Sequence, residues 1–186
     1  MYPRWKIGPR RDRGFPGRGL GQTTTQRRIV LAIGLPGSGK STYFARKGIT
    51  PLSSDLLRQL LFDNPADQRL PGSVFGILRH LLTVRLAAGA RISYVDATNL
   101  TRRDRRHFFK IAERFGCAVD ALYFDVPVEM CLARNGQRAR RVPEAVIRRM
   151  AQRLQPPTAG EGFRRILVLG RARGKARGGK GRDGVS

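Results

Sequence analysis

The stretch IVLAIGLPGSGKSTYFARKG, from Ile29 to Gly48, carries the strongest fold signal of the chain. It opens with a short continuous apolar run, which is typical of a strand buried on both faces of a parallel sheet. The segment from Gly34 to Ser41 then matches the pattern G-x-x-x-x-G-K-[ST] in full. Its glycines permit backbone torsions that side chains forbid, so that consecutive N–H groups can surround an anion. A helix that begins near Gly39 adds the positive end of its dipole, and the stretch therefore predicts a phosphate-binding loop.

Two side chains of this loop suit a nucleoside triphosphate. Lys40 can reach the β and γ phosphates, and the hydroxyl of Ser41 can ligate magnesium. A chance glycine turn is the alternative, but a buried strand before the loop and a helix after it favour nucleotide binding. The residues predicted to bind the nucleotide are Gly34, Leu35, Pro36, Gly37, Ser38, Gly39, Lys40, Ser41 and Thr42.

Strand-like and helix-like segments alternate along the rest of the chain. Strands are expected at 28–34, 49–54, 91–98, 117–126 and 164–170. Helices are expected from near residue 39 and at 55–62, 73–88, 101–116, 127–136 and 143–154. Such alternation predicts an α/β fold, with a parallel sheet of about five strands and helices on both faces.

Two of the expected helices carry finer signals. One broad apolar face of the 73–88 helix is formed by Val74, Ile77, Leu78, Leu81, Leu82 and Leu86. In the 101–116 helix, Thr101 followed by Asp104 resembles a capping box. The phenylalanines of that helix are expected in the core.

Carboxylates in two segments of the sequence are candidates for catalysis or metal binding. In SSDLLR, Asp55 and Arg58 are three residues apart, a neighbouring position on a helix. Asp55 could take the proton of an attacking hydroxyl, and Arg58 could hold an anionic group of the acceptor. The alternative is a helix-capping Asp55 with a surface Arg58, and spacing alone favours that alternative.

The second place is VDATN, at the carboxyl end of a strand, where such sheets form their ligand crevice. Asp96 could help to order magnesium through water. Thr98 and Asn99 could be turn and cap residues only.

Four arginines lie between two expected helices, at Arg134, Arg138, Arg140 and Arg141. One interpretation is a lid that folds arginines over the triphosphate and stabilises the transferring charge. An exposed basic loop is the alternative, and it is weakened because the four residues surround one expected hinge, Gly136.

The charge of the chain favours a polyanionic partner. Among 186 residues there are 37 Lys and Arg against 13 Asp and Glu, a net charge of +24. Residues 1–27 carry a net +6, residues 171–186 a net +5 and residues 28–170 a net +13. We expect arms at 1–26 and 171–186 that are disordered, because both lack apolar periodicity, and one domain at 27–170.

Cysteine and hydrophobic content bear on the compartment. Cys117 and Cys131 form neither a disulfide framework nor a zinc site, and both are expected in the core. The chain shows no secretory signal at its start and no apolar run long enough to cross a bilayer, so that a cytoplasmic location is expected.

Taken together, GLPGSGKST, SSDLLR, VDATNLTRRDRR, FDVPVEMCLARNGQR and RVPEAVIRRM resemble the kinase domain of the polynucleotide kinase family. The resemblance runs from about residue 29 to residue 169. It implies a P-loop kinase that moves the γ-phosphate of ATP to the 5′-hydroxyl of RNA or DNA, with Mg²⁺.

The same resemblance implies roles for individual residues. It makes Asp55 the general base and Arg58 the ligand of an acceptor phosphate, with Thr98 and Asn99 at the acceptor. The catalytic arginines of the lid correspond to Arg134 and Arg138, although Arg140 or Arg141 could substitute. Lys40 is the catalytic cation, and Ser41 and Asp96 serve the metal.

One feature of some family members is missing from this sequence. We find no D-x-D-x-[TV] phosphatase signature, so we expect a kinase without a phosphatase activity. Two alternatives remain open, a small-molecule kinase of the same fold and a non-catalytic ATP-dependent nucleic-acid-binding protein. The basic body disfavours the first of these, and the presence of both Asp55 and Arg58 disfavours the second.

Overall fold

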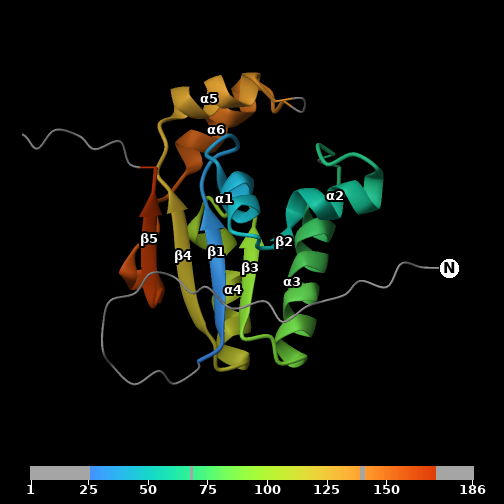
Figure 1. Cartoon of the computed structure of the whole chain (residues 1–186), viewed down its shortest axis with the longest axis vertical. Helices are drawn as coiled ribbons and strands as arrows, with labels where there is room; N and C mark the ends of the chain where they lie inside the picture. The colour runs from blue at the N-terminus through green and yellow to red at the C-terminus, as the bar shows by residue number, and fades with distance from the viewer. Residues whose placement is uncertain (1–25, 68, 139–140, 171–186) are drawn as a thin grey trace, which may run out of the picture.

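The computed structural model describes residues 26–67, 69–138 and 141–170. Five parallel strands form a single sheet in the order β2-β3-β1-β4-β5 (Figure 1). The strands are β1 (Arg28–Ile33), β2 (Leu52–Ser53), β3 (Ile92–Asp96), β4 (Ala118–Phe124) and β5 (Arg165–Leu169). The prediction of an α/β fold with a parallel sheet of about five strands is confirmed.

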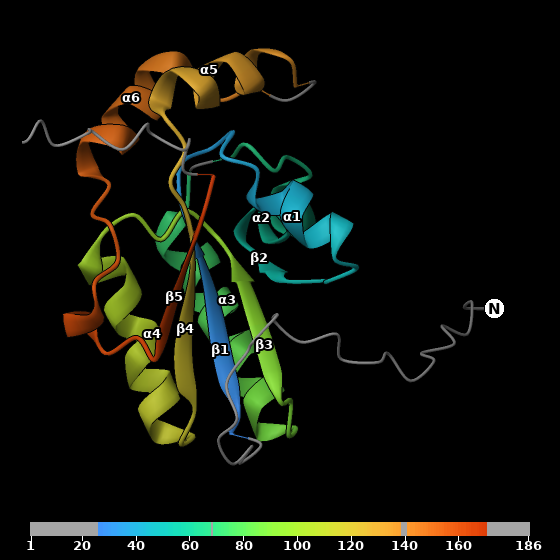
Figure 2. The same cartoon turned by 60° about the vertical axis from the view of Figure 1, so that its left-hand side comes forward.

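Helices cover both faces of the sheet. They are α1 (Lys40–Arg46), α2 (Ser54–Phe62), α3 (Pro71–Ala87), α4 (Arg102–Arg114), α5 (Val128–Gly136) and α6 (Glu144–Arg153), with a short 3₁₀ helix, η1, at Ala159–Glu161. The helices α3 and α4 lie on one face and α1 on the other, whereas α5 and α6 lie beyond the carboxyl ends of the strands (Figures 1 and 2). The carboxyl ends of β1, β3 and β4 therefore meet beneath the α5–α6 pair.

The apolar run of β1 forms the centre of the core. Residues 29–33 are all fully buried because the strand has helices on both sides. Ile29, Leu31 and Ile33 pack in the cluster that contains the buried side chains of α3 and α4. The alternate residues Val30 and Ala32 pack in the cluster of α1. The loop that follows β1 is thus anchored by a strand that cannot shift without disturbing both clusters.

The apolar face of α3 is narrower than its sequence pattern predicts. Burial is complete for a row at four-residue spacing, namely Val74, Leu78, Leu82 and Leu86. Ile77 is half-buried, but Leu81 is 37% exposed, so the expectation that Leu81 lies on the buried face is wrong. The row contacts the sheet along one side of the helix, and Leu81 is turned away from that row.

Several local predictions are confirmed. In α4 the Thr101 side chain accepts a hydrogen bond from Asp104 N at 3.1 Å, and the Asp104 carboxylate accepts one from Thr101 N at 3.0 Å, which completes the capping box. Phe108 is buried in the core, and Phe109 packs against it. Cys131 is buried, Cys117 is partly buried, and both are free thiols. No helix of the described residues could span a membrane.

The predicted arms, at 1–26 and 171–186, lie outside the described residues except for Gln26. Arg140 of the predicted lid also lies outside them.

Candidate active site

The loop between β1 and α1 lies at the carboxyl edge of the sheet, as predicted. Gly34 N donates a hydrogen bond to Thr98 O at 3.1 Å, which ties the start of the loop to the end of β3. Gly37 has a positive φ of 83°, and a Cβ at this position would collide with the backbone carbonyl of Cys131 in α5. Gly37 is therefore required both by the turn of the loop and by the close approach of α5.

Lys40 folds back into the loop from the first turn of α1. Its ammonium donates hydrogen bonds to Gly34 O and Leu35 O, both at 2.8 Å. Burial lowers the pKa of Lys40 from 10.5 to about 8, although the carboxylates of Asp96 and Asp55 oppose this shift. An anion that enters the loop would favour the charged ammonium, and the cation is therefore held where phosphates would meet it.

Ser41 and Asp96 meet at the edge between α1 and β3. The hydroxyl of Ser41 donates to Asp96 Oδ2 at 3.0 Å. Burial raises the pKa of Asp96, whereas the charge of Lys40 and the hydrogen bond from Ser41 act in the opposite direction. A hydroxyl and a carboxylate beside a phosphate loop fit Mg²⁺, which prefers a few oxygen ligands from the protein together with phosphate and water. The metal role of the two residues stays a prediction.

Asp55 and Arg58 form an ion pair on the first turn of α2. Arg58 Nη1 donates to Asp55 Oδ1 at 3.2 Å, with the Asp55 side chain 55% exposed and that of Arg58 only 7% exposed. The residue that caps α2 is Ser53, whose side chain accepts a hydrogen bond from Leu56 N. The alternative of a capping Asp55 with a surface Arg58 is therefore wrong on both counts.

Electrostatic influence connects these residues with the phosphate loop. The charge of Asp55 raises the pKa of Lys40, so the Asp55 carboxylate and the Lys40 ammonium interact electrostatically. The Nε of Arg58 is buried without a hydrogen-bond partner among the described residues. A buried donor that lacks a partner has a cost of about 1–3 kcal/mol, which an anionic ligand would remove.

Thr98 and Asn99 lie in the turn between β3 and α4. Asn99 is buried with a left-handed φ of 47°, and its Nδ2 donates to Ala32 O of β1 at 2.7 Å. The Oδ1 of Asn99 is buried without a hydrogen-bond partner among the described residues. Thr98 contributes its carbonyl to the loop contact with Gly34. These contacts match the turn role that the sequence left open, and contact with an acceptor stays a prediction.

Two of the lid arginines lie near the phosphate loop. Arg134 is in the last turn of α5 and Arg138 follows that helix, and both are exposed. The positive charge of Arg138 lowers the pKa of Lys40. Burial raises the pKa of Cys131 in α5, and the charges of both arginines act in the opposite direction. Arg141 instead lines a groove between α5 and α6, together with Asn135 and Gly136.

The structure also reveals positioning residues that the sequence reasoning missed. Asn135 closes the lid loop, because its Nδ2 donates to Val142 O at 2.8 Å and its Oδ1 accepts from Val142 N at 3.0 Å. An asparagine near a helix end carries no signal that would have singled it out.

Arg105 was also missed, although a signal was present. It is 0% exposed and forms a bidentate pair with Glu161, while its Nη1 donates to the carbonyls of Asn99, Leu100 and Gln155. Arg105 therefore fixes the β3–α4 turn against the segment that leads to β5. Its spacing with the buried residues Phe108 and Ala112 of α4 follows the helical period and could have revealed it.

Two curated proteins are similar to parts of this chain. The chain is 29% identical over 150 residues to "Transcription factor bHLH140" of Arabidopsis thaliana. The matched region is 75% of this chain and 15% of that protein. It is 25% identical over 140 residues to an L-seryl-tRNA(Sec) kinase of Methanococcus maripaludis, which covers 69% of this chain and 53% of the relative. The chain therefore spans about half or less of these relatives.

Similarity to a solved structure supports the fold. The Pnkp1/Rnl/Hen1 RNA repair complex contains a chain that is similar with a TM-score of 0.59 and 19% identity, over 69% of this chain and 44% of that one. The model of the AAA domain family matches residues 29–157. That range extends from the first residues of β1 to just past α6 and includes the phosphate loop, Asp55, Arg58 and Asp96. The chain belongs to the AAA domain family and has the fold of P-loop kinases.

Proposed function

We propose that this domain is an ATP-dependent kinase that transfers the γ-phosphate of ATP to the 5′-hydroxyl of a polynucleotide. The observation that carries the proposal is the Asp55–Arg58 pair at the carboxyl edge of the sheet. The carboxylate is exposed and within electrostatic reach of Lys40, and the arginine is buried beside it with an Nε that lacks a partner among the described residues. A hydroxyl and a neighbouring phosphate of one acceptor suit these two groups.

The proposed reaction divides the work among residues of this chain. The backbone N–H groups of the loop and Lys40 bind the triphosphate. Asp55 accepts the proton of the acceptor hydroxyl while the hydroxyl oxygen forms a bond to the γ-phosphorus. The bond between that phosphorus and the β–γ bridging oxygen breaks, and ADP leaves. Arg138 and Arg134 stabilise the charge on the transferring oxygens.

Ser41 and Asp96 would hold Mg²⁺ at the triphosphate. When bound, the ion neutralises negative charge that develops on the phosphate oxygens. The hydrogen bond between Ser41 and Asp96 already brings both oxygens together at one point.

The choice of a polynucleotide as acceptor rests on charge and on Arg58. A fold by itself does not specify a substrate, and small-molecule kinases are compatible with the same sheet and loop. The net charge of +13 on residues 28–170 favours a polyanion. The buried position of Arg58 favours an acceptor that carries a phosphate next to the hydroxyl.

The test compares two enzymes with two acceptors. The parent and Arg58→Ala are assayed with labelled ATP on a nucleoside 3′-phosphate and on the matching nucleoside, and the parent is also assayed on 5′-hydroxyl oligonucleotides and small alcohols. A charge-assisted phosphate contact of about 1.5–3 kcal/mol predicts a loss of roughly ten- to 150-fold in kcat/KM for the phosphorylated acceptor only. The KM for ATP should remain nearly constant.

Controls separate the possible roles. Arg46→Ala removes an exposed arginine from α1 and should leave both acceptors unaffected. Asp55→Asn should slow transfer by roughly 10²- to 10⁴-fold with ATP affinity nearly kept, because only the base is lost. Equal losses on both acceptors would make Arg58 structural, and a preference of the parent for a small uncharged alcohol would overturn the proposal.

A further inference from the structure

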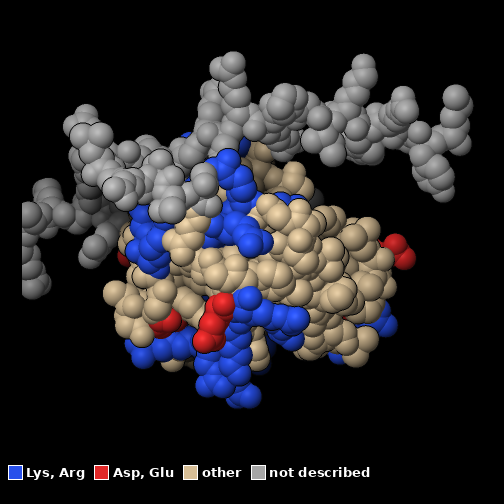
Figure 3. Space-filling model, turned by 90° about the horizontal axis from the view of Figure 1, so that it is seen from below, with Lys and Arg blue, Asp and Glu red and all other residues tan. Residues whose placement is uncertain are grey.

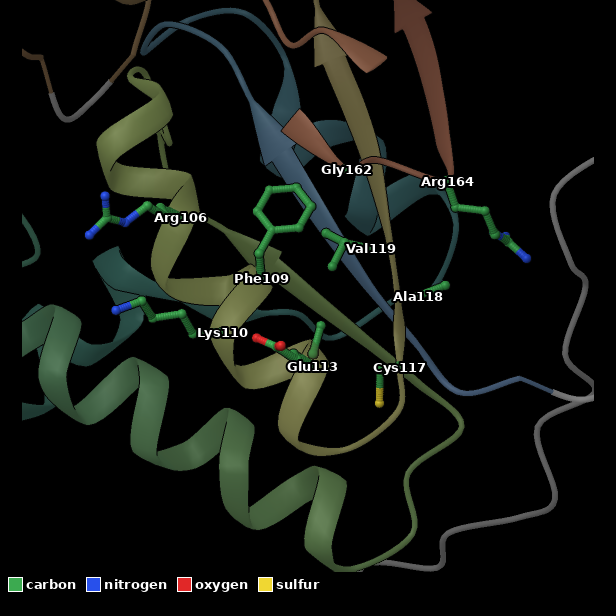
Figure 4. Close-up of a pocket in the computed structure, with 10 residues that line it drawn as sticks. Arg106, Phe109, Lys110, Glu113, Cys117, Ala118, Val119, Gly162 and Arg164 are labelled. Atoms are coloured by element: carbon green, nitrogen blue, oxygen red, sulfur yellow. The ribbon is translucent and has the colours of Figure 1, made fainter. Parts of the chain in front are cut away.

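A groove lies on the flank of α4, near the amino ends of the strands and away from the phosphate loop. Its volume is about 370 Å³, which is within the range of small-ligand sites, about 300–1,000 Å³. Helix α4 forms one side, and the other side is formed by the starts of β4 and β5 with the turn after η1 (Figure 4). None of the residues assigned to phosphate transfer lines it.

The floor of the groove is apolar and contains a fixed aromatic ring. Phe109 and Val119 both line the groove (Figure 4). The ring of Phe109 packs edge-on against Phe163, with 4.9 Å between the centroids. Gly162 has no side chain that would cover the ring, and a Cβ at this position would lie 3.5 Å from it. Phe109 is only partly buried, so part of its side chain is accessible from the groove.

Polar groups lie around this floor. Glu113 lines the groove from α4, with its carboxylate on the side toward Lys110 (Figure 4). Arg164 lies at the opposite side, where Asp120 holds its guanidinium through two hydrogen bonds of 3.0 and 2.7 Å. The Arg164 side chain is 45% exposed, and its guanidinium points away from Phe109 and out of the groove (Figure 4).

The rim on α4 is cationic. Arg106 and Lys110 line the groove one helical turn apart, and Arg103 and Arg114 continue the same spacing along the helix. Among the residues that the structure describes, no carboxylate forms an ion pair with Arg106 or Lys110. Lys and Arg side chains also outnumber acidic ones at this end of the domain (Figure 3).

His107 lies beside this rim on α4, and its pKa responds to the nearby cations. Partial burial lowers the pKa of His107, and the positive charges of Arg79, Lys110 and Arg106 lower it further, against a smaller effect of Asp104. A polyanion at the rim would therefore find cations that are not already neutralised.

We propose that this groove binds single-stranded nucleic acid, with an unstacked base on Phe109 and phosphates at Arg106 and Lys110. Such a combination of an aromatic platform and a cationic track is the general means of binding a single strand. Glu113 would accept a hydrogen bond from an exocyclic amine of the base, which cytosine has and uracil lacks. The arms of this chain are disfavoured as occupants because both are strongly basic, each with a net charge of +5.

This inference goes beyond the proposed kinase and does not depend on it. A domain that phosphorylated a small alcohol could still bind a strand here, and a polynucleotide kinase could lack the groove contact. The test therefore measures binding without ATP, by fluorescence anisotropy of labelled oligonucleotides of about twelve residues with the intact chain.

The cationic rim is tested by a matched pair of double variants. Arg106→Gln/Lys110→Gln should weaken binding and reduce the slope of log affinity against log salt by about 1.4, or roughly 0.7 for each phosphate that is no longer neutralised. Arg149→Gln/Arg153→Gln removes two exposed arginines at the same spacing from α6 and should change the slope much less. Equal slopes in the two double variants would overturn the proposal.

The base pocket is tested separately. Phe109→Leu keeps an apolar side chain against Phe163 but loses the aromatic face, and should weaken binding of a single strand about five- to hundredfold.

The parent should prefer oligo-C to oligo-U by roughly two- to tenfold, and Glu113→Ala should remove that preference. Thermal melting checks that each variant is folded. A duplex that binds as tightly as the single strand, or a preference that survives Glu113→Ala, would contradict a base-binding groove.

Discussion

Among single residues, Lys40 connects protonation to nucleotide binding. Its pKa is about 8 because the ammonium is buried, so the protonated fraction falls to about a tenth at pH 9. Phosphates in the loop would restore the charged form. We therefore expect nucleotide binding to take up close to one proton near pH 9 and far less near pH 7.

Calorimetry in buffers of different ionisation enthalpy measures this uptake. Lys40→Met should abolish phosphate transfer and remove the uptake near pH 9, and the same uptake in the variant would assign the proton to another group.

The stability of the nucleotide-free parent provides a second check. The folded pKa lies below the unfolded value of 10.5, so the free energy of unfolding should rise between about pH 8 and 10.5, and this rise should be absent in Lys40→Met.

Gly37 and Gly39 form a natural comparison of two residues in one loop. Both have positive φ, at 83° and 96°, but a Cβ on Gly39 would meet nothing within 4 Å, whereas one on Gly37 would collide with the backbone of α5. Gly39→Ala should lose about 1–2 kcal/mol of stability through backbone strain alone. Gly37→Ala should lose a further 1–3 kcal/mol or so from the collision.

Urea unfolding without nucleotide measures both variants under conditions in which binding of phosphate plays no part. If the two substitutions cost the same, the approach of α5 to the loop does not constrain Gly37.

Between elements, one buried arginine joins α4 to the segment between α6 and β5. Arg105→Met should destabilise the fold by about 3–5 kcal/mol, because it removes the bidentate partner of Glu161 and a donor to the carbonyls of Asn99, Leu100 and Gln155. Denaturant unfolding should show a much smaller loss for Arg103→Met, which changes an exposed arginine of the same helix.

A double variant distinguishes an ion pair from simple packing. Arg105→Met/Glu161→Met removes both charges and should be more stable than Arg105→Met alone. A double variant that loses the sum of the two single effects would show that Arg105 and Glu161 act independently.

Across the whole molecule, positive charge lies both on the body of the chain and on its two ends. Removal of residues 1–26 and 171–186 takes away most of the net +6 and +5 of these ends and leaves a body that is still basic. We expect weaker binding of oligonucleotides and a smaller salt slope, because fewer phosphates are neutralised, with an unchanged melting temperature. Equal affinity and slope with and without the ends would leave nucleic-acid binding to the body alone.

Local sequence patterns were sufficient to predict the sheet, the loop and the order of elements. An apolar run before a glycine-rich loop, and the alternation of strand and helix patterns after it, depend on neighbouring residues, and local patterns report such features well. The capping box at Thr101 and Asp104 is local in the same sense, and its prediction is confirmed. The role of Arg105 also had a local signal, in its spacing with Phe108, but its charge argued against burial.

Which distant residues meet became clear only from the packing of the chain. Ser41 and Asp96 are 55 positions apart, and they touch because β1 and β3 are neighbours in the sheet. Whether Arg58 was a surface or a buried residue could not be read from its spacing with Asp55, since burial depends on what packs over α2. The groove at Phe109 has the same origin, because it forms only where α4 meets the starts of β4 and β5. Arrangements of this kind depend on how distant segments pack, and no local pattern encodes that packing.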